Sequence, residues 1–83
     1  MIHARKDYNR IQDPLNAKDK GIPKEEPVFL LRAQDRLFIP TLLNYLTMAN
    51  QIGCSPEMQQ TIRVHIELAA LYNIKHPTKV PDL

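Results

Sequence analysis

Residues 40–75, PTLLNYLTMANQIGCSPEMQQTIRVHIELAALYNIK, decide the fold of this chain. Pro40 suits the first turn of a helix, because the backbone N–H that it lacks has no helical partner there. No helix breaker follows until Gly53, and glycine readily takes the left-handed conformation that ends many helices. A first helix is therefore predicted at about 40–52.

The second helix carries signals at both of its ends. Ser55 is a residue type that caps helix N-termini, Pro56 fits the first helical position, and Glu57 places an acid near the positive end of the helix dipole. The His76-Pro77 pair stops the pattern. A second helix is predicted at about 56–75, and the tight link between the two helices predicts an antiparallel helical hairpin.

Both predicted helices are apolar over more of their circumference than one partner helix can cover. At 100° per residue, the apolar side chains of each helix spread over an arc of roughly 220°, whereas a surface helix needs only about 100°. They are Leu42, Leu43, Tyr45, Leu46, Met48, Ala49 and Ile52 in the first helix, and Met58, Ile62, Val64, Ile66, Leu68, Ala69, Leu71 and Tyr72 in the second. We therefore expect a homodimer or a higher homo-oligomer whose interface is built from these helices.

The residues around the hairpin divide into three further parts. The run from Val28 to Leu31 is rich in strand-forming residues and predicts a short strand at 28–32, with one turn of buried helix as the rival. Such a strand would pair with the N-terminal arm or with a symmetry mate. Residues 1–27 predict an extended polar and basic arm, either free in solvent or laid as a strap over a neighbouring surface. The fold class is thus mainly α, with one small α-rich domain at 28–76 and a polar tail at 77–83.

The length and the cysteine content bear on stability and on location. A chain of 83 residues is at most one small domain and buries only about 60–65% of its unfolded surface. The single cysteine, Cys54, rules out a disulfide within the chain, so a partner subunit is the leading source of extra stability. The lone thiol, with no targeting segment and no long apolar run, predicts a soluble protein of a reducing cytoplasm without membrane contact.

The charge balance argues against a dedicated nucleic-acid binder. The net charge is +2, from 11 Lys and Arg against 9 Asp and Glu, which is too balanced for a protein that tracks duplex DNA. The second helix carries only Arg63 and Lys75 as cations, and neither lies at the N-terminal positions from which a recognition helix reads bases. A small DNA-binding regulator is therefore only the second alternative for the function.

The sequence offers little for catalysis or for a metal. It has no glycine-rich phosphate loop and no nucleophile or zinc motif. Cys54 reads as a linker thiol, since no histidine or acid is tied to it by local sequence. His65 lies within the apolar arc of the second helix and is most simply a core or interface histidine, with a ligand-pocket group as the alternative. We expect no enzymatic activity, no cofactor and no metal.

The polar residues between the strand-like run and the first helix are the candidate binding site. The Arg32 guanidinium is a bidentate donor suited to phosphate or carboxylate, and Gln34 can read an amide or a base edge. Asp35 is also well suited to accept a hydrogen bond in a turn, and structural and ligand roles are weighed equally for this cluster. The arm contributes a second polar group to the predicted ligand-binding set, namely Tyr8, Asn9 and Arg10.

The segment EPVFLLRAQD at Glu26 to Asp35, followed by a helix that opens at Pro40, resembles a set of short, mostly unassigned proteins of tailed phages and prophages. The resemblance covers about residues 22–72 and does not extend to the arm. Small phage accessory proteins of this kind often act against host defence, and one class works as sponges that sequester nucleotide-derived signals between subunits. The likeness to the sponge class rests on size and predicted assembly alone, which is an analogy at the level of the fold.

These observations lead to one leading hypothesis and one principal alternative. The leading hypothesis is a non-enzymatic phage anti-defence protein in the host cytoplasm that sequesters a small anionic, nucleotide-like signal at a subunit interface, where enclosed pockets commonly form. Arg32 would hold the phosphate, and Tyr8, Asn9 and Gln34 would stack on or read the base. The alternative is a protein-interaction module that binds a host or virion protein through its wide apolar helices.

Overall fold

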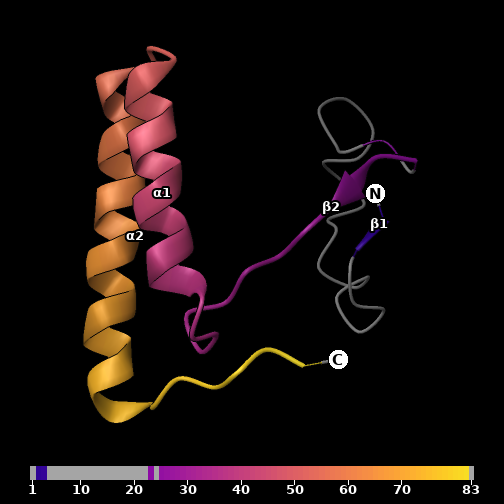
Figure 1. Cartoon of the computed structure of the whole chain (residues 1–83), viewed down its shortest axis with the longest axis vertical. Coiled ribbons are helices and arrows are strands. Elements are labelled where there is room, and N and C mark those ends of the chain that lie inside the picture. The colour runs from indigo at the N-terminus through magenta and orange to yellow at the C-terminus, as the bar shows by residue number, and fades with distance from the viewer. Residues whose placement is uncertain (1, 4–22, 24, 83) are drawn as a thin grey trace. The chain divides into compact units, whose positions relative to one another are not determined.

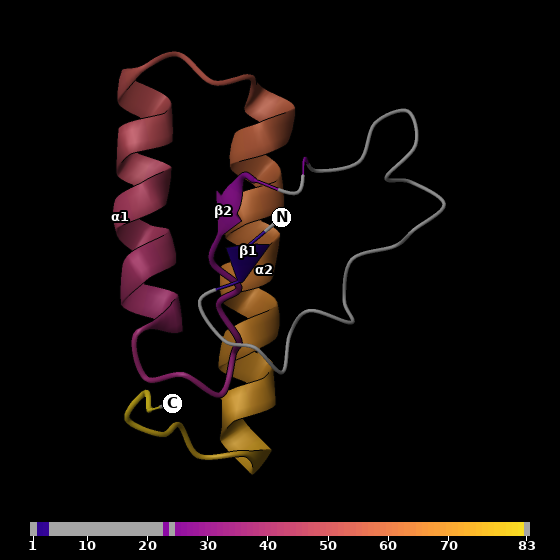
Figure 2. The same ribbon diagram turned by 90° about the vertical axis from the view of Figure 1, so that its right-hand side faces the viewer.

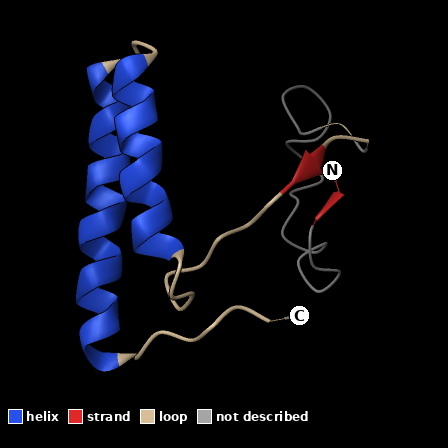
Figure 3. Ribbon diagram, viewed as in Figure 1, coloured by secondary structure: helices blue, strands red, loops and turns tan. Residues whose placement is uncertain are grey.

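The computed structural model describes residues 2–3, 23 and 25–82, and within this part the chain is mainly helical (Figures 1 and 3). The elements follow in the order β1 (Ile2–His3), β2 (Pro27–Val28), α1 (Phe38–Gln51) and α2 (Pro56–Lys75). The chain separates into two compact units, and the second of them, Leu31–Asp82, holds both helices. The two helices predicted from the sequence are confirmed.

The first unit contains the short sheet. Strands β1 and β2 pair in parallel, with Ile2 opposite Pro27 and His3 opposite Val28. The expected strand at 28–32 is thus shorter and begins earlier, because Phe29 to Arg32 have no regular structure. A strand extends only as far as a neighbour pairs with it, and β1 offers two residues. Apart from residues 2–3, 23 and 25–27, the predicted arm at 1–27 lies outside the described residues.

Helix α1 begins two residues earlier than expected, at Phe38. The turn before it is held by Asp35, whose Oδ1 accepts a hydrogen bond of 2.7 Å from the backbone N–H of Leu37. The backbone N–H of Phe38 also donates to the carbonyl of Asp35, at 3.0 Å. Pro40 therefore sits in the first turn rather than at its start, and its missing N–H still costs no helical hydrogen bond.

The loop between the helices satisfies the polar groups of both helix ends. Gly53 has a φ of 79°; the backbone N–H of Cys54 donates to the carbonyl of Ala49, and that of Gly53 to the carbonyl of Asn50. This pair of bonds is the Schellman pattern that ends a helix at a left-handed glycine. On the other side, the Oγ of Ser55 accepts a hydrogen bond from the N–H of Met58, as the sequence predicted.

The two helices lie antiparallel and meet along a narrow seam (Figures 1 and 2). Among the described residues, the buried apolar side chains are Ala49 of α1 and Ile62 and Ala69 of α2. Half-buried neighbours extend the seam at three- and four-residue spacing, namely Leu42 and Leu46 on α1 and Ile66 and Asn73 on α2. Two of the three buried residues are alanines, so the backbones approach closely where the helices touch.

The C-terminal tail is tied back to the turn before α1. Asp35 and Lys79 form a parallel β-bridge, in which the N–H of Lys79 donates to the carbonyl of Gln34 and the N–H of Arg36 donates to the carbonyl of Lys79, each at 2.8 Å. The bridge closes the open end of the hairpin, where α1 starts and α2 stops. It connects residues more than forty positions apart in the sequence.

The close approach of α1 and α2 at the seam predicts that larger side chains there lower the stability of the hairpin. Replacing Ala69 with leucine forces a larger side chain against α1 and should lower the free energy of unfolding by about 1–3 kcal/mol, measured by chemical denaturation. The neighbouring Ala70 is exposed, so Ala70→Leu is the matched control and should leave the unfolding midpoint nearly unchanged. Equal effects of the two substitutions would contradict the packing of α2 on α1 described above.

Candidate functional site

One face of the hairpin carries large apolar side chains that the seam does not cover. We call it the groove face, and it consists of Tyr45, Met48 and Ile52 on α1 and Met58, His65 and Tyr72 on α2. All six are exposed. At 100° per residue, these side chains lie on the same flank of each helix, about 40–120° around from the seam. Exposed apolar residues are normal when scattered singly, but a contiguous group of them marks an interaction surface.

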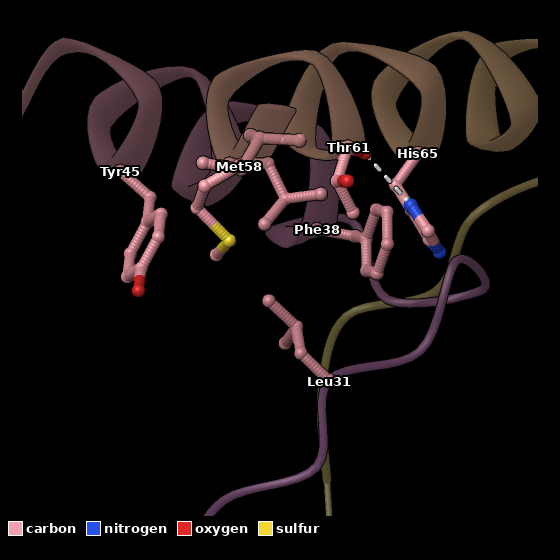
Figure 4. A pocket seen from close by; sticks show the side chains of 8 residues that line it. Leu31, Phe38, Tyr45, Met58, Thr61 and His65 are labelled. Atoms are coloured by element: carbon pink, nitrogen blue, oxygen red, sulfur yellow. Dashed lines mark hydrogen bonds between the residues drawn. The ribbon is translucent and has the colours of Figure 1, made fainter. Parts of the chain in front are cut away.

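A groove of about 330 Å³ opens on this face between the two helices (Figure 4). Leu42 and Ile62 contribute to its lining from the seam, and Leu31 contributes from the segment before α1. The remaining lining residues are Phe38, Tyr45, Met58, Thr61 and His65. Among the described residues that line the groove there is no Asp, Glu, Lys or Arg, so the groove suits apolar or aromatic groups rather than a bare phosphate.

His65 is the one titratable imidazole at this groove among the described residues. Its Nδ1 lies 2.8 Å from the backbone carbonyl of Thr61, one turn earlier on α2 (Figure 4). A carbonyl oxygen only accepts, so Nδ1 carries the proton and Nε2 of the neutral ring is an acceptor at the groove rim. His65 is thus at the groove, which agrees with its predicted place in the apolar arc, and its side chain is exposed within this chain.

The opposite face of the hairpin has a different character. Helical geometry places Leu43 and Asn50 of α1, and Arg63, Glu67, Ala70 and Ile74 of α2, on this side, and all six are exposed. The Arg63 guanidinium reaches the Gln60 side chain at 3.5 Å, on the same side of α2. The hairpin therefore has one largely apolar broad face and one of mixed character, which combines apolar Leu43 and Ile74 with charged and amide side chains.

The residues predicted to bind a ligand are only partly brought together. Arg32 is exposed, Gln34 and Asp35 are half-buried, and the backbone of this segment pairs with Lys79 in the bridge described above. The carboxylate of Asp35 holds the turn through Leu37, which is the structural role that the sequence allowed. Tyr8, Asn9 and Arg10 lie outside the described residues, so their predicted role beside Arg32 stays a prediction.

Two sets of residues in this region were not singled out from the sequence. Lys79 belongs to the predicted polar tail at 77–83, yet its backbone pairs with those of Gln34 and Arg36. Leu31 belongs to the predicted strand and Met58 to the apolar arc of the second helix, and both line the groove together with Phe38, which precedes the predicted first helix. No local pattern marks the first set, because a bridge across more than forty residues leaves no periodicity. Of the second set, only Met58 could have been found by aligning the apolar arcs of the two helices at their predicted seam, because Leu31 and Phe38 lie outside both predicted helices.

The described part of the chain contains neither a group of three or more His, Cys, Asp or Glu residues placed to hold a metal ion nor a helix long and apolar enough to cross a membrane. Cys54 is half-buried in the interhelical loop, where its carbonyl accepts a hydrogen bond of 3.0 Å from the Gln59 side chain. Its surroundings are therefore those of a loop residue that joins two helices.

Comparison with known proteins does not assign this site. No protein-family model, no curated protein and no solved structure matches the chain. The two faces of the hairpin and the turn that carries Arg32 are therefore the features that bear on the function of this chain.

The different surroundings of Asp35 and Arg32 make a testable distinction. Asp35→Ala removes the acceptor of the Leu37 N–H at the start of α1 and should lower the free energy of unfolding by about 1 kcal/mol. Arg32→Ala changes an exposed side chain and should stay within about 0.5 kcal/mol of the unchanged protein. Urea denaturation followed by circular dichroism measures both. A large loss of stability in Arg32→Ala would mean that Arg32 has a structural role instead of being free for a ligand.

Proposed function

We propose that this chain is a non-enzymatic binding protein that assembles with copies of itself through the groove face. The observation that carries the proposal is the contrast between the two broad faces of the hairpin. The groove face exposes aromatic and large aliphatic side chains around a groove whose described lining residues include no Asp, Glu, Lys or Arg, whereas the opposite face mixes the exposed apolar side chains of Leu43 and Ile74 with charged and amide side chains.

The thin core is what makes such an assembly favourable. Only three small or medium side chains are buried among the described residues, and a two-helix unit with so little buried apolar area is marginal without further partners. Covering the groove face with a second apolar surface removes Tyr45, Met48 and Ile52 from water together with their counterparts on α2. Each large side chain so covered contributes roughly 1–2 kcal/mol.

The size of the groove face fits a protein partner. Large aromatic side chains have about 150–250 Å² of surface each, and the five apolar residues of the groove face are 42–80% exposed. Together they offer an area on the order of 600 Å², compared with about 800 Å² per partner in a standard protein interface. A second copy of the chain carries the same apolar surface and can therefore cover the groove face. A host or virion protein with an apolar helix is the alternative occupant.

A second candidate function is the capture of a small anionic ligand by the turn that carries Arg32. The supporting observation is the bridge between Asp35 and Lys79, which brings the exposed Lys79 to the segment that already carries the exposed Arg32 and Arg36. Several cations near one backbone turn suit phosphate groups. In this proposal Gln34, Tyr8, Asn9 and Arg10 complete the site at a subunit interface, and the ligand is a nucleotide-like signal.

The biological setting proposed here is that of a phage accessory protein acting against host defence in the host cytoplasm. Its support is the resemblance of residues 22–72 to short phage and prophage proteins. That setting suits both candidate functions, since either a captured signal or an occupied host protein would blunt a defence response. The groove-face assembly does not depend on it.

The assembly has a direct test in a matched pair of substitutions on α1. Met48 and Leu43 are 54% and 51% exposed in the isolated chain, but they lie about 140° apart around the helix, on the groove face and on the opposite face. Met48→Glu would place a carboxylate in the interface and should reduce the assembly to monomers, because burying an unpaired charge costs several kcal/mol. Leu43→Glu should leave the molar mass unchanged.

Light scattering coupled to size-exclusion chromatography measures the molar mass of each variant, and circular dichroism reports whether the helices remain. A monomeric wild-type chain, or an oligomer that both substitutions disrupt equally, would contradict the use of the groove face. An oligomer that neither substitution changes would place the contact elsewhere on the chain.

The ligand hypothesis has an independent test in thermal shift. Cyclic dinucleotides and cyclic ADP-ribose isomers at about 100 times the dissociation constant should stabilise a binding protein by about 2.7 kcal/mol, seen as a raised melting temperature. Arg32→Ala should remove that shift, whereas Arg63→Ala, which removes an exposed arginine from the opposite face, should retain it. If no compound of these classes shifts the unmodified protein, a nucleotide-like ligand is excluded for this set.

A further inference from the structure

Helix α2 carries a second stripe of residues, separate from its seam with α1. We call it the outer stripe: Glu57, Thr61, Val64, Leu68, Leu71 and Lys75. These residues follow one another at alternating spacings of four and three, the spacing at which helices pack side by side in coiled coils. At 100° per residue the outer stripe is centred about 150° away from the seam residues Ile62, Ile66 and Ala69. It therefore faces away from α1.

The middle of the outer stripe is apolar and open to solvent. Leu68 and Leu71 are 54% and 65% exposed, and Val64 is 38% exposed. The seam with α1 already accounts for the other side of α2. A helix with apolar stripes at coiled-coil spacing on two opposite sides is typical of a helix packed between two neighbours. Only one of those neighbours, α1, lies within the described hairpin.

The ends of the outer stripe carry opposite charges. Glu57 lies in the first turn of α2 and Lys75 in the last, and both are exposed. They are 18 residues apart, which is five full turns, so they point in the same direction about 27 Å apart along the helix. The stripe is also symmetric about Ile66: Val64 and Leu68 are equally far from it, as are Thr61 and Leu71, and Glu57 and Lys75.

This pattern is self-complementary in one orientation only. Consider two copies of α2 that pack side by side and antiparallel, related by a two-fold axis that crosses the helices at the height of Ile66. Glu57 of one copy then meets Lys75 of the partner subunit, and the reverse pair forms at the other end. Val64 then lies beside Leu68 of the partner subunit in the apolar middle. In a parallel pair, each charge would meet its own copy, and like charges at close range repel.

We propose that α2 packs against α2 of a second copy of this chain, antiparallel, through the outer stripe. This inference rests on the proposed self-association and identifies one of its contacts. It differs from the groove-face contact, which uses another flank of α2 and also α1, although Thr61 at the edge of the outer stripe also lines the groove. An isologous contact of this kind is the commonest way in which identical subunits associate.

The charges alone have a competing explanation. An acid in the first turn and a base in the last turn also stabilise a single helix through its dipole. The two explanations differ for the exchange of both charges. The double substitution Glu57→Lys with Lys75→Glu places a base in the first turn and an acid in the last turn, and each of these destabilises a single helix through its dipole. In an antiparallel dimer, however, the same double substitution restores both intersubunit charge pairs.

The first experiment measures the dissociation constant of the full-length chain by analytical ultracentrifugation at low salt. Glu57→Lys alone or Lys75→Glu alone should raise this constant on the order of tenfold, because both pairs change from attraction to repulsion, and the effect should shrink at high salt. The double exchange should bring it back to the wild-type value. The matched control is the single charge reversal Arg63→Glu, about 120° around α2 from the centre of the outer stripe, which should leave the dissociation constant near the wild-type value.

The second experiment reads the orientation with introduced cysteines in a Cys54→Ser background. Glu57→Cys and Lys75→Cys are made as separate variants, mixed, and oxidised mildly. An antiparallel pair brings positions 57 and 75 of the two copies together and leaves like positions about 27 Å apart. A disulfide-linked dimer should therefore form in the mixture and not in either variant alone, since a disulfide needs Cα atoms within about 7 Å.

The outcomes separate this inference from the proposed function. An oligomer that Met48→Glu disrupts, but in which the double exchange fails to restore association, overturns the α2 contact and leaves the groove-face assembly standing. If the double exchange restores association and Met48→Glu has no effect, the α2 contact stands and the groove-face assembly is overturned. Disulfide formation within the single-variant samples would indicate a parallel pair and overturn the proposal, as would a monomeric wild-type chain.

Discussion

The close contact of α1 and α2 at Ala49, Ile62 and Ala69 is the constraint on which the rest of the hairpin depends. Small side chains at the contact bring the two backbones together, and so only one stripe of each helix is enclosed. The larger side chains must then lie on the flanks. Both the groove face and the outer stripe follow from this arrangement, because α1 and α2 are the only helices or strands among the described residues of this unit.

The ends of the hairpin are held in different ways, and this difference separates structural from available residues. The loop end is closed locally by the left-handed Gly53 and the Ser55 cap. The open end is closed by a long-range bridge between the turn before α1 and the C-terminal tail. That bridge uses backbone groups of Gln34, Arg36 and Lys79, and the carboxylate of Asp35 accepts a hydrogen bond within the turn. The side chains of Arg36 and Lys79 therefore take no part in the bridge and can contact other partners.

The two proposed contacts divide the apolar surface of α2 between them. The groove face combines α2 with α1 and with Leu31 from the preceding segment, whereas the outer stripe belongs to α2 alone. An α2 helix enclosed on three sides would be a core helix of an assembly, although it is a surface helix in one chain. This accounts for an apolar arc of roughly 220°, about twice what a surface helix needs.

Local signals explain which parts of the fold were predictable. The bounds of α2 and the capping by Ser55 agree with the prediction because each depends on residues adjacent in sequence. The start of α1 was placed two residues late, because Asp35 begins the turn through a hydrogen bond that no helix-former pattern reveals. The strand was predicted too long, since its length depends on a distant partner, Ile2–His3.

The sequence by itself determined two helices, their caps and their wide apolar arcs, because periodicity and capping are properties of neighbouring residues. It also placed His65 in the apolar arc and Asp35 in a turn. Only the tertiary structure decided which part of each arc is buried and which part forms a groove, and it alone brought Lys79 beside Gln34 and Arg36. Which stripe is buried depends on how the two helix surfaces meet. The helical period does not reveal it, because the period is the same for every stripe of one helix.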